Sequence, residues 1–246
     1  KSIFTTAESF HDYKVYDKKP DEGVLYIGKM PENLTGSLKS IKDEFYKSIP
    51  EERKKDMTYH IWYKNLPDNI KSNFDKVRNS NIWRDIFCKQ NESTCVIEPI
   101  TEMDELYYSK PPNDIENSTI YAAVGNYKLH IDFISYPGMI INRVLIGMTP
   151  NEYTATEFPK KDISHKLNTN EFVAFDFGRE WHKVKKDINS PKSEYRIMAK
   201  LHFIVCKKCK HKSLYFKLVK QIHVLYIYIS RYILKTGTNP KNLYEF

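Results

Sequence analysis

Three residues in the second half of the chain have the side chains expected of a metal site: His130, Asp132 and His182. His130 and Asp132 are two residues apart, so an extended strand places both on one face. His182 follows an apolar run that ends at a glycine turn. Two imidazoles and one carboxylate on one side of a metal leave three positions open for small ligands, which suits oxygen chemistry at Fe(II).

Arg196 stands fourteen residues after His182 within a strand-like run. Zinc hydrolysis also uses three protein ligands, but that interpretation gives a buried arginine no task. His165 and Arg179 repeat the same spacing. We favour His182 and Arg196, because His165 falls in a polar loop over Lys160–Asn170 and Arg179 in a turn. The remaining interpretation is that all these residues are surface or satisfied polar groups of a β domain.

The order His130-x-Asp132, then His182, then Arg196 resembles the 2-oxoglutarate and Fe(II)-dependent dioxygenase superfamily, over about residues 118–206. The resemblance implies that the first three residues bind iron and that Arg196 forms a salt bridge with the distal carboxylate of 2-oxoglutarate. A guanidinium fork suits that carboxylate. We expect Asn142 or Arg143, in a neighbouring strand, to assist Arg196.

The implied activity uses 2-oxoglutarate and O2 to hydroxylate an unidentified substrate, with release of succinate and CO2. We expect a peptide side chain or a small molecule as substrate. Nucleic-acid demethylases of this superfamily usually carry a second arginine six residues after the first, where this chain has His202. The alternatives are a family member without turnover, and a non-catalytic β-scaffold whose basic, Tyr-rich tail binds nucleic acid, a membrane surface or a protein.

The elements around these residues predict an α+β fold: a double-stranded β-helix (jelly-roll) core with N-terminal helical and mixed decoration. Runs rich in β-branched and aromatic residues predict four strands. They are Tyr127–Ser135, Met139–Met148, Glu171–Phe177 and Tyr195–Cys206. Apolar residues at helical spacing predict helices through Leu38–Phe45, Ile70–Val77 and Ile82–Phe87. We expect a mixed α/β part over residues 1–117, the catalytic core over 118–206 and a basic helix and tail over 207–246.

Positive charge concentrates in that tail. From Cys206 onward there are nine Lys or Arg and one acid, so the first 205 residues carry 30 of each sign. The tail is expected to form an amphipathic helix over Ser213–Leu234. Its stripe of Leu218, Ile222, Leu225, Ile229 and Tyr232 is predicted to pack on the domain or on a second copy, giving a homodimer. The basic face then remains available to an anionic partner.

The four cysteines, Cys88, Cys95, Cys206 and Cys209, are sparser than in a small disulfide-stapled secreted domain, which favours a cytoplasmic location. Cys206 and Cys209 have the spacing of a zinc knuckle, but a second half-site is over a hundred residues away. We therefore expect free or paired thiols and no zinc there. The chain begins at Lys1, so we expect a trimmed N-terminus and leave an upstream signal or anchor open.

Overall fold

The structure is a computed structural model of the 246-residue chain. It describes residues 13–16, 23–88, 94–118, 127–131, 136–209 and 214–233, with only the backbone described at 231 and 232.

Three helices precede the core. They are α1 (Glu32–Ser48), α2 (Asp68–Arg78) and α3 (Ile82–Phe87). Each buries the apolar stripe that predicted it, for example Leu38, Ile41 and Phe45 in α1. Helix α2 ends at Arg78, with Asn79 as its C-terminal cap, so α2 and α3 are separate helices, as the pattern indicated. Helix α1 begins earlier than expected and includes Gly36, because Pro31 provides an extended N-terminal cap just before Glu32.

The large antiparallel sheet has the order β1-β2-β9-β6-β11-β5-β3, with β4 also pairing β11. Its strands are β1 (Tyr13–Tyr16), β2 (Leu25–Lys29), β3 (Thr58–Trp62), β4 (Val96–Pro99), β5 (Glu105–Ser109), β6 (Ile140–Gly147), β9 (Glu171–Asp176) and β11 (Arg196–Cys206). Strands β6, β9 and β11 match three of the predicted strands to within two residues. The expected strand Tyr127–Ser135 falls partly outside the described residues, since 132–135 are not described.

A small antiparallel sheet has the order β10-β7-β8. Its strands are β7 (Thr154–Phe158), β8 (Ile163–His165) and β10 (Lys183–Lys186). Two antiparallel sheets with helical decoration confirm the predicted α+β jelly-roll class. The strands of the N-terminal part extend the large sheet directly, because β2 pairs β9 and β5 pairs β11. The division at residues 117 and 118 remains a prediction.

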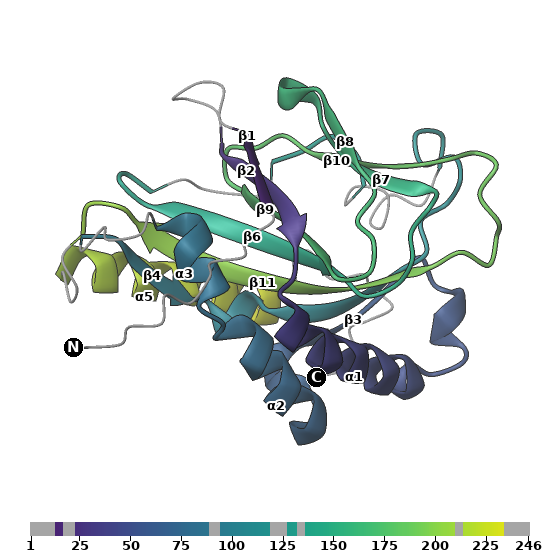
Figure 1. The fold of residues 1–246 in the computed structure, drawn as a ribbon, viewed down its shortest axis with the longest axis horizontal. Helices are drawn as coiled ribbons and strands as arrows, with labels where there is room; N and C mark the ends of the chain where they lie inside the picture. The colour runs from purple at the N-terminus through teal and green to yellow at the C-terminus, as the bar shows by residue number, and fades with distance from the viewer. Residues whose placement is uncertain are drawn as a thin grey trace, which may run out of the picture.

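The two faces of the large sheet are covered differently (Figure 1). Helices α1, α2 and α3 pack on one face, where Ile197, Ala199 and Leu201 of β11 point. The opposite face receives Met198 and Ile204 of the same strand and packs toward the small sheet and the C-terminal helix. Side chains along β11 alternate between these two faces, which places Arg196 on the inner face, between the sheets.

The C-terminal helix α5 (Leu214–Tyr228) lies within the predicted helix Ser213–Leu234 and continues through a π-helical turn at Ile229–Ile233. The side on which it packs was predicted wrongly. Its buried side chains are Phe216, Val219, His223 and Ile227, whereas Leu218, Ile222, Leu225 and Ile229 are exposed. The helix is apolar almost all round, so periodicity alone does not fix its packing side. The side is set by His223, which contacts Tyr136 Oη at 3.0 Å and Met103 Sδ at 3.3 Å.

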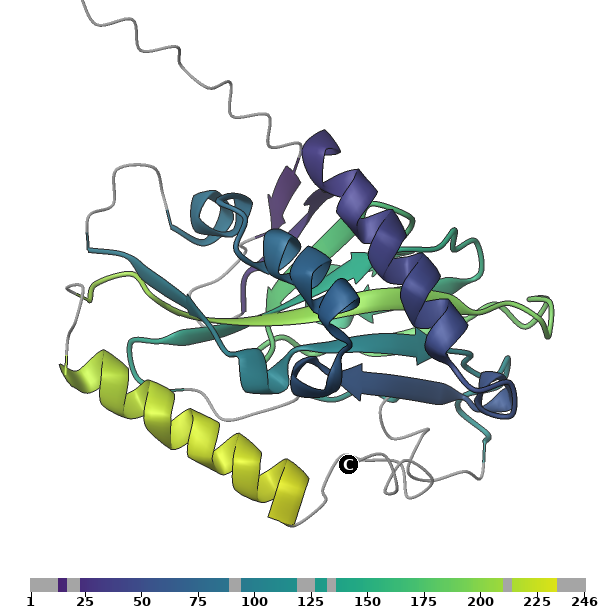
Figure 2. The same cartoon turned by 90° about the horizontal axis from the view of Figure 1, so that it is seen from below.

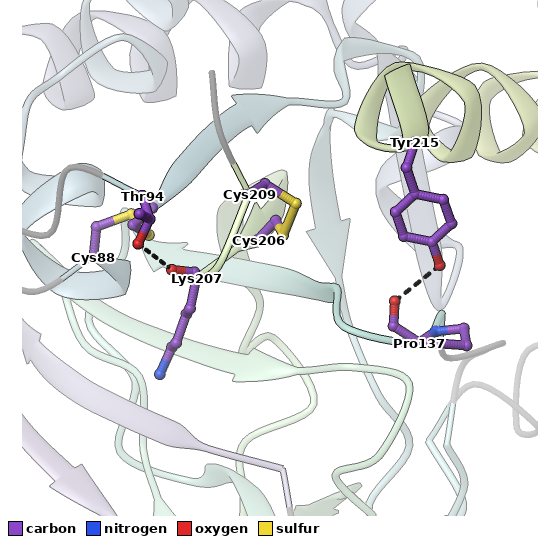
Figure 3. The surroundings of a disulfide bond; sticks show 8 residues. Cys88, Thr94, Pro137, Cys206, Lys207, Cys209 and Tyr215 are labelled. Carbon is purple, nitrogen blue, oxygen red and sulfur yellow. Dashed lines mark hydrogen bonds between the residues drawn. A yellow bond between two sulfur atoms is a disulfide. The ribbon is translucent and has the colours of Figure 1, made fainter. Parts of the chain in front are cut away.

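Two disulfides lie close together near the end of β11 (Figure 3). One joins Cys88 to Cys95 and the other joins Cys206 to Cys209. The adjoining strands connect them, since Val96 pairs with Cys206 and the Thr94 hydroxyl donates to the Lys207 carbonyl at 3.0 Å. The bonded Cys206 and Cys209 offer no thiolate to zinc. Across the described residues, no helix has the length and apolar character needed to cross a membrane.

Candidate active site

His130 and His182 are brought together by the backbone. Each peptide N–H donates to the other residue's carbonyl at 3.0 Å, which forms an isolated antiparallel pair. The two imidazole rings lie with their centroids 4.4 Å apart. The third predicted ligand, Asp132, lies outside the described residues. Within the described part of the chain, no three His, Cys, Asp or Glu side chains form a metal-binding group.

Both imidazoles are oriented by backbone carbonyls. The Nδ1 atom of His182 lies 3.1 Å from the Glu180 carbonyl oxygen, and the Nδ1 atom of His130 contacts the Lys128 carbonyl oxygen. A carbonyl oxygen only accepts, so in both residues Nδ1 donates the hydrogen and the ring lone pair is on Nε2. Metal-ligating histidines are commonly held in this way. The two side chains therefore have the tautomer that Nε2 ligation requires.

An aromatic wall surrounds His182. Its ring centroid is 4.8 Å from that of Phe175 and 6.3 Å from that of Phe158. Both phenylalanines are fully buried in the core between the sheets. The apolar side chains beside His130, Leu129 and Ile131, are both exposed. They belong to a short paired segment and not to a strand ladder, so no sheet covers them.

Arg196 begins β11, opposite Ser109 of β5, and is 7% exposed. Its Nε has no hydrogen-bond partner, and no carboxylate forms an ion pair with it among the described residues. Burial lowers the pKa of Arg196, which nearby Tyr127, Tyr107 and Glu194 partly offset. The guanidinium nevertheless remains protonated. The site thus contains a buried cation that forms no ion pair with a described carboxylate.

Other polar residues on the same face of β11 are paired. Lys200 binds Glu105 at 2.8 Å and lies over the Tyr107 ring. His202 accepts from Arg143 Nε at 3.1 Å. Arg196 therefore differs from Lys200, since no described carboxylate forms an ion pair with it.

Tyr127 connects the histidine pair to Arg196. Its carbonyl accepts from Val184 N at 2.8 Å, two residues after His182. Its hydroxyl donates to the Met57 carbonyl at 3.0 Å and lies 3.1 Å from Ser109 Oγ, directly across the sheet from Arg196. Burial raises the pKa of Tyr127, and that of Tyr107 well above its usual range, so both phenols are neutral. Neither phenol was predicted as part of the site. The aromatic run Glu105–Ser109 indicates a strand, but only the pairing of that strand with β11 brings Tyr107 near Arg196.

Asn142 and Arg143 are not beside Arg196, so the expected assistance is wrong. In the register of β6 with β11, Arg143 faces His202 and Asn142 faces Phe203. Six or seven residues of strand separate these positions from Arg196, which is roughly 20 Å. The strands are antiparallel, so the backbone near Arg196 meets the far end of β6, where Met148 N donates to Ile197 O.

The competing pair, His165 and Arg179, has other partners. His165 is the last residue of β8, not part of a loop as expected, and lies 3.4 Å from Glu171. Arg179 lies 3.5 Å from Asp176. Each residue of this competing pair therefore already has a carboxylate partner, unlike Arg196 among the described residues.

No protein-family model matches the chain, and no curated protein matches it in sequence. Several solved structures overlap it at 12% identity. A viral collagen prolyl hydroxylase from Paramecium Bursaria Chlorella virus-1, in its 2OG complex, covers 72% of this chain and 94% of its own, with a TM-score of 0.43. A putative oxygenase from Shewanella oneidensis covers 84% and 92%, with a TM-score of 0.47. A Trichoplax adhaerens prolyl hydroxylase in complex with a hypoxia inducible factor peptide fragment covers 73% and 82%, with a TM-score of 0.43.

Proposed function

We propose that the chain is an Fe(II)- and 2-oxoglutarate-dependent oxygenase that hydroxylates a peptide side chain or a small molecule. In this proposal His130, Asp132 and His182 hold the iron and Arg196 binds the distal carboxylate of 2-oxoglutarate. The observation that supports it best is the buried Arg196, which is linked to the histidine segment through Tyr127 and forms no ion pair with a described carboxylate.

The energetics of Arg196 favour an anionic ligand. A buried charge without a partner destabilises the folded protein by roughly 3–5 kcal/mol, as when one partner of a buried ion pair is removed. A carboxylate binding the guanidinium fork recovers that free energy through charge-assisted hydrogen bonds. The phenols of Tyr107 and Tyr127 are neutral, so neither supplies the negative charge that the guanidinium would bind.

In this proposal the two histidines hold the metal, and Arg196 holds 2-oxoglutarate. The carbonyls of Lys128 and Glu180 fix the Nδ1–H tautomer of both imidazoles, which directs Nε2 to a metal. Phe158 and Phe175 exclude water from the His182 side. Bound iron, 2-oxoglutarate and O2 would together supply the oxidising power for C–H hydroxylation.

Metal analysis of purified variants tests the proposal. We expect about one divalent metal per wild-type chain after reconstitution with Fe(II) without oxygen, and loss of it in His130→Ala and in His182→Ala. His165→Gln is the matched control, because this histidine already pairs with Glu171. Succinate formation from 2-oxoglutarate should follow metal content. Full occupancy in either active-site variant, or equal loss in the control, would rule out the assigned ligands.

The alternative of a non-catalytic scaffold makes a different prediction for the same samples. A scaffold has no stoichiometric metal and forms no succinate above a metal-only control. The exposed apolar face of α5 supports a docking role for this helix. Docking through α5 is compatible with catalysis at a separate site.

A further inference from the structure

Helix α5 and its π-helical continuation expose most of the large apolar side chains found on the described surface. Thirteen large hydrophobic residues are exposed there, and nine belong to residues 214–233. The nine are Leu214 (81%), Tyr215 (47%), Leu218 (55%), Ile222 (49%), Leu225 (58%), Tyr226 (38%), Tyr228 (54%), Ile229 (37%) and Ile233 (60%). We call this set the outer face of α5. The other four are Val15, Leu129, Ile131 and Ile188.

The outer face forms one continuous stripe. Leu218, Ile222, Leu225 and Ile229 follow a spacing of three and four residues, so they lie along one side of the helix. The opposite side, through Phe216, Val219 and Ile227, is buried on the domain. At about half exposure, nine such side chains present on the order of 700 Å² of apolar surface. Soluble monomers rarely leave a patch of that size uncovered.

The position of α5 leaves this face accessible. In Figure 2, α5 lies on the opposite side of the large sheet from α1 and α2, along the margin of the molecule. It is attached to the domain through its inner side and through the ion pair between Lys220 and Glu98. The Tyr215 hydroxyl also donates to the Pro137 carbonyl at 3.0 Å (Figure 3). These contacts orient the helix with the outer face directed away from the core.

The charge around this helix distinguishes a lipid surface from a second copy. Residues from Cys206 onward carry nine basic side chains and one acid, and Lys207, Lys208 and Lys217 are exposed. A twofold dimer through the outer face would bring two identical basic segments together, which is unfavourable. An anionic bilayer would attract them, while the aliphatic side chains enter the acyl boundary and the tyrosines remain near the headgroups.

We propose that the outer face of α5 docks the protein on anionic lipid membranes, with the helix lying in the plane of the interface. The helix does not span the bilayer. Apolar burial supplies the attachment, and Lys207, Lys208 and Lys217 supply the preference for anionic headgroups. This role does not depend on the proposed oxygenase activity.

Vesicle sedimentation of the full chain tests the proposal. Wild type should sediment with vesicles of phosphatidylcholine and phosphatidylserine, bind pure phosphatidylcholine less well, and lose part of this preference at high salt. Leu218→Ser with Leu225→Ser should weaken binding to both vesicles by about tenfold or more. Lys207→Gln, Lys208→Gln and Lys217→Gln together should remove mainly the phosphatidylserine preference.

Ile188→Ser is the matched control, because Ile188 is 73% exposed and lies outside α5. It should bind as wild type does, and circular dichroism should show every variant folded. Absence of vesicle binding by wild type, or unchanged binding by the double serine variant, would overturn the proposal. So would a solution mass of twice 29.2 kDa that the double variant reduces to 29.2 kDa, since a second copy would then cover the face.

Discussion

The buried charge of Arg196 has opposite effects on the free protein and on the ligand-bound protein. Without an anion, the guanidinium loses hydration and gains no ion pair among the described residues. With a carboxylate bound, the same side chain becomes the strongest anchor in the site. Replacement by an apolar side chain of similar length separates the two effects.

We predict that Arg196→Met leaves the unliganded protein as stable as wild type, or more stable by about 1–4 kcal/mol. The same variant should lose the rise in melting temperature that 2-oxoglutarate produces in wild type. Thermal unfolding with Mn(II), with and without 2-oxoglutarate, measures both effects. Arg179→Met is the control, because Arg179 pairs with Asp176 near the surface. An equal ligand-induced rise in Arg196→Met would contradict the assignment.

At the scale of elements, two glycines differ in whether their surroundings leave room for a side chain. A Cβ at Gly147, the last residue of β6, would lie 2.2 Å from the Asn168 carbonyl oxygen. A Cβ at Gly36, inside α1, would meet nothing within 4 Å. The backbone around Gly147 is also tied to this loop, since Asn170 N donates to Gly147 O at 2.9 Å.

Gly147→Ala should therefore destabilise the fold by about 1–3 kcal/mol, because the loop must move to admit the methyl group. Gly36→Ala should stabilise it by about 0.8 kcal/mol through helix propensity. Urea unfolding of both variants provides the measurement. If Gly147→Ala proves neutral, the close approach of β6 to the loop after β8 is incorrect.

Helices and strands were predictable from sequence where the spacing of apolar residues fitted only one type of element. Strands β6, β9 and β11 and helices α1 to α3 have clear apolar patterns, and each lies where its pattern predicted it. The pairing register was not available from the sequence. For this reason Arg143 was expected near Arg196 although it faces His202.

The packing side of α5 was unpredictable for another reason. Both sides of the helix are apolar, and the one that packs is selected by His223 through its contacts with Tyr136 and Met103, residues distant in sequence. The meeting of His130 with His182 agrees with the expected site, and their roles as iron ligands remain a prediction. The phenols around Arg196 were missed, because Tyr107 and Tyr127 approach it only through strand pairing.

At the scale of the whole molecule, the two disulfides bear on where the protein resides. Cysteine content favoured a cytoplasmic location, which remains a prediction. Disulfides form and persist mainly in oxidising compartments, so the bonds Cys88–Cys95 and Cys206–Cys209 weigh against it. Together they constrain the chain before β4 and the chain between β11 and α5, at one end of the large sheet.

We predict that the purified protein has no free thiols when titrated in denaturant. Reduction should lower the free energy of unfolding by about 2 kcal/mol for each bond, because the unfolded chain regains conformational freedom. Urea unfolding with and without a phosphine reductant measures the change. The paired variants Cys88→Ser with Cys95→Ser, and Cys206→Ser with Cys209→Ser, assign it to one bond or the other. The second pair should also loosen α5, since Cys209 is buried in the same core as Phe216. Four titratable thiols in protein prepared without reductant, with no effect of the reductant on stability, would show that the bonds do not form.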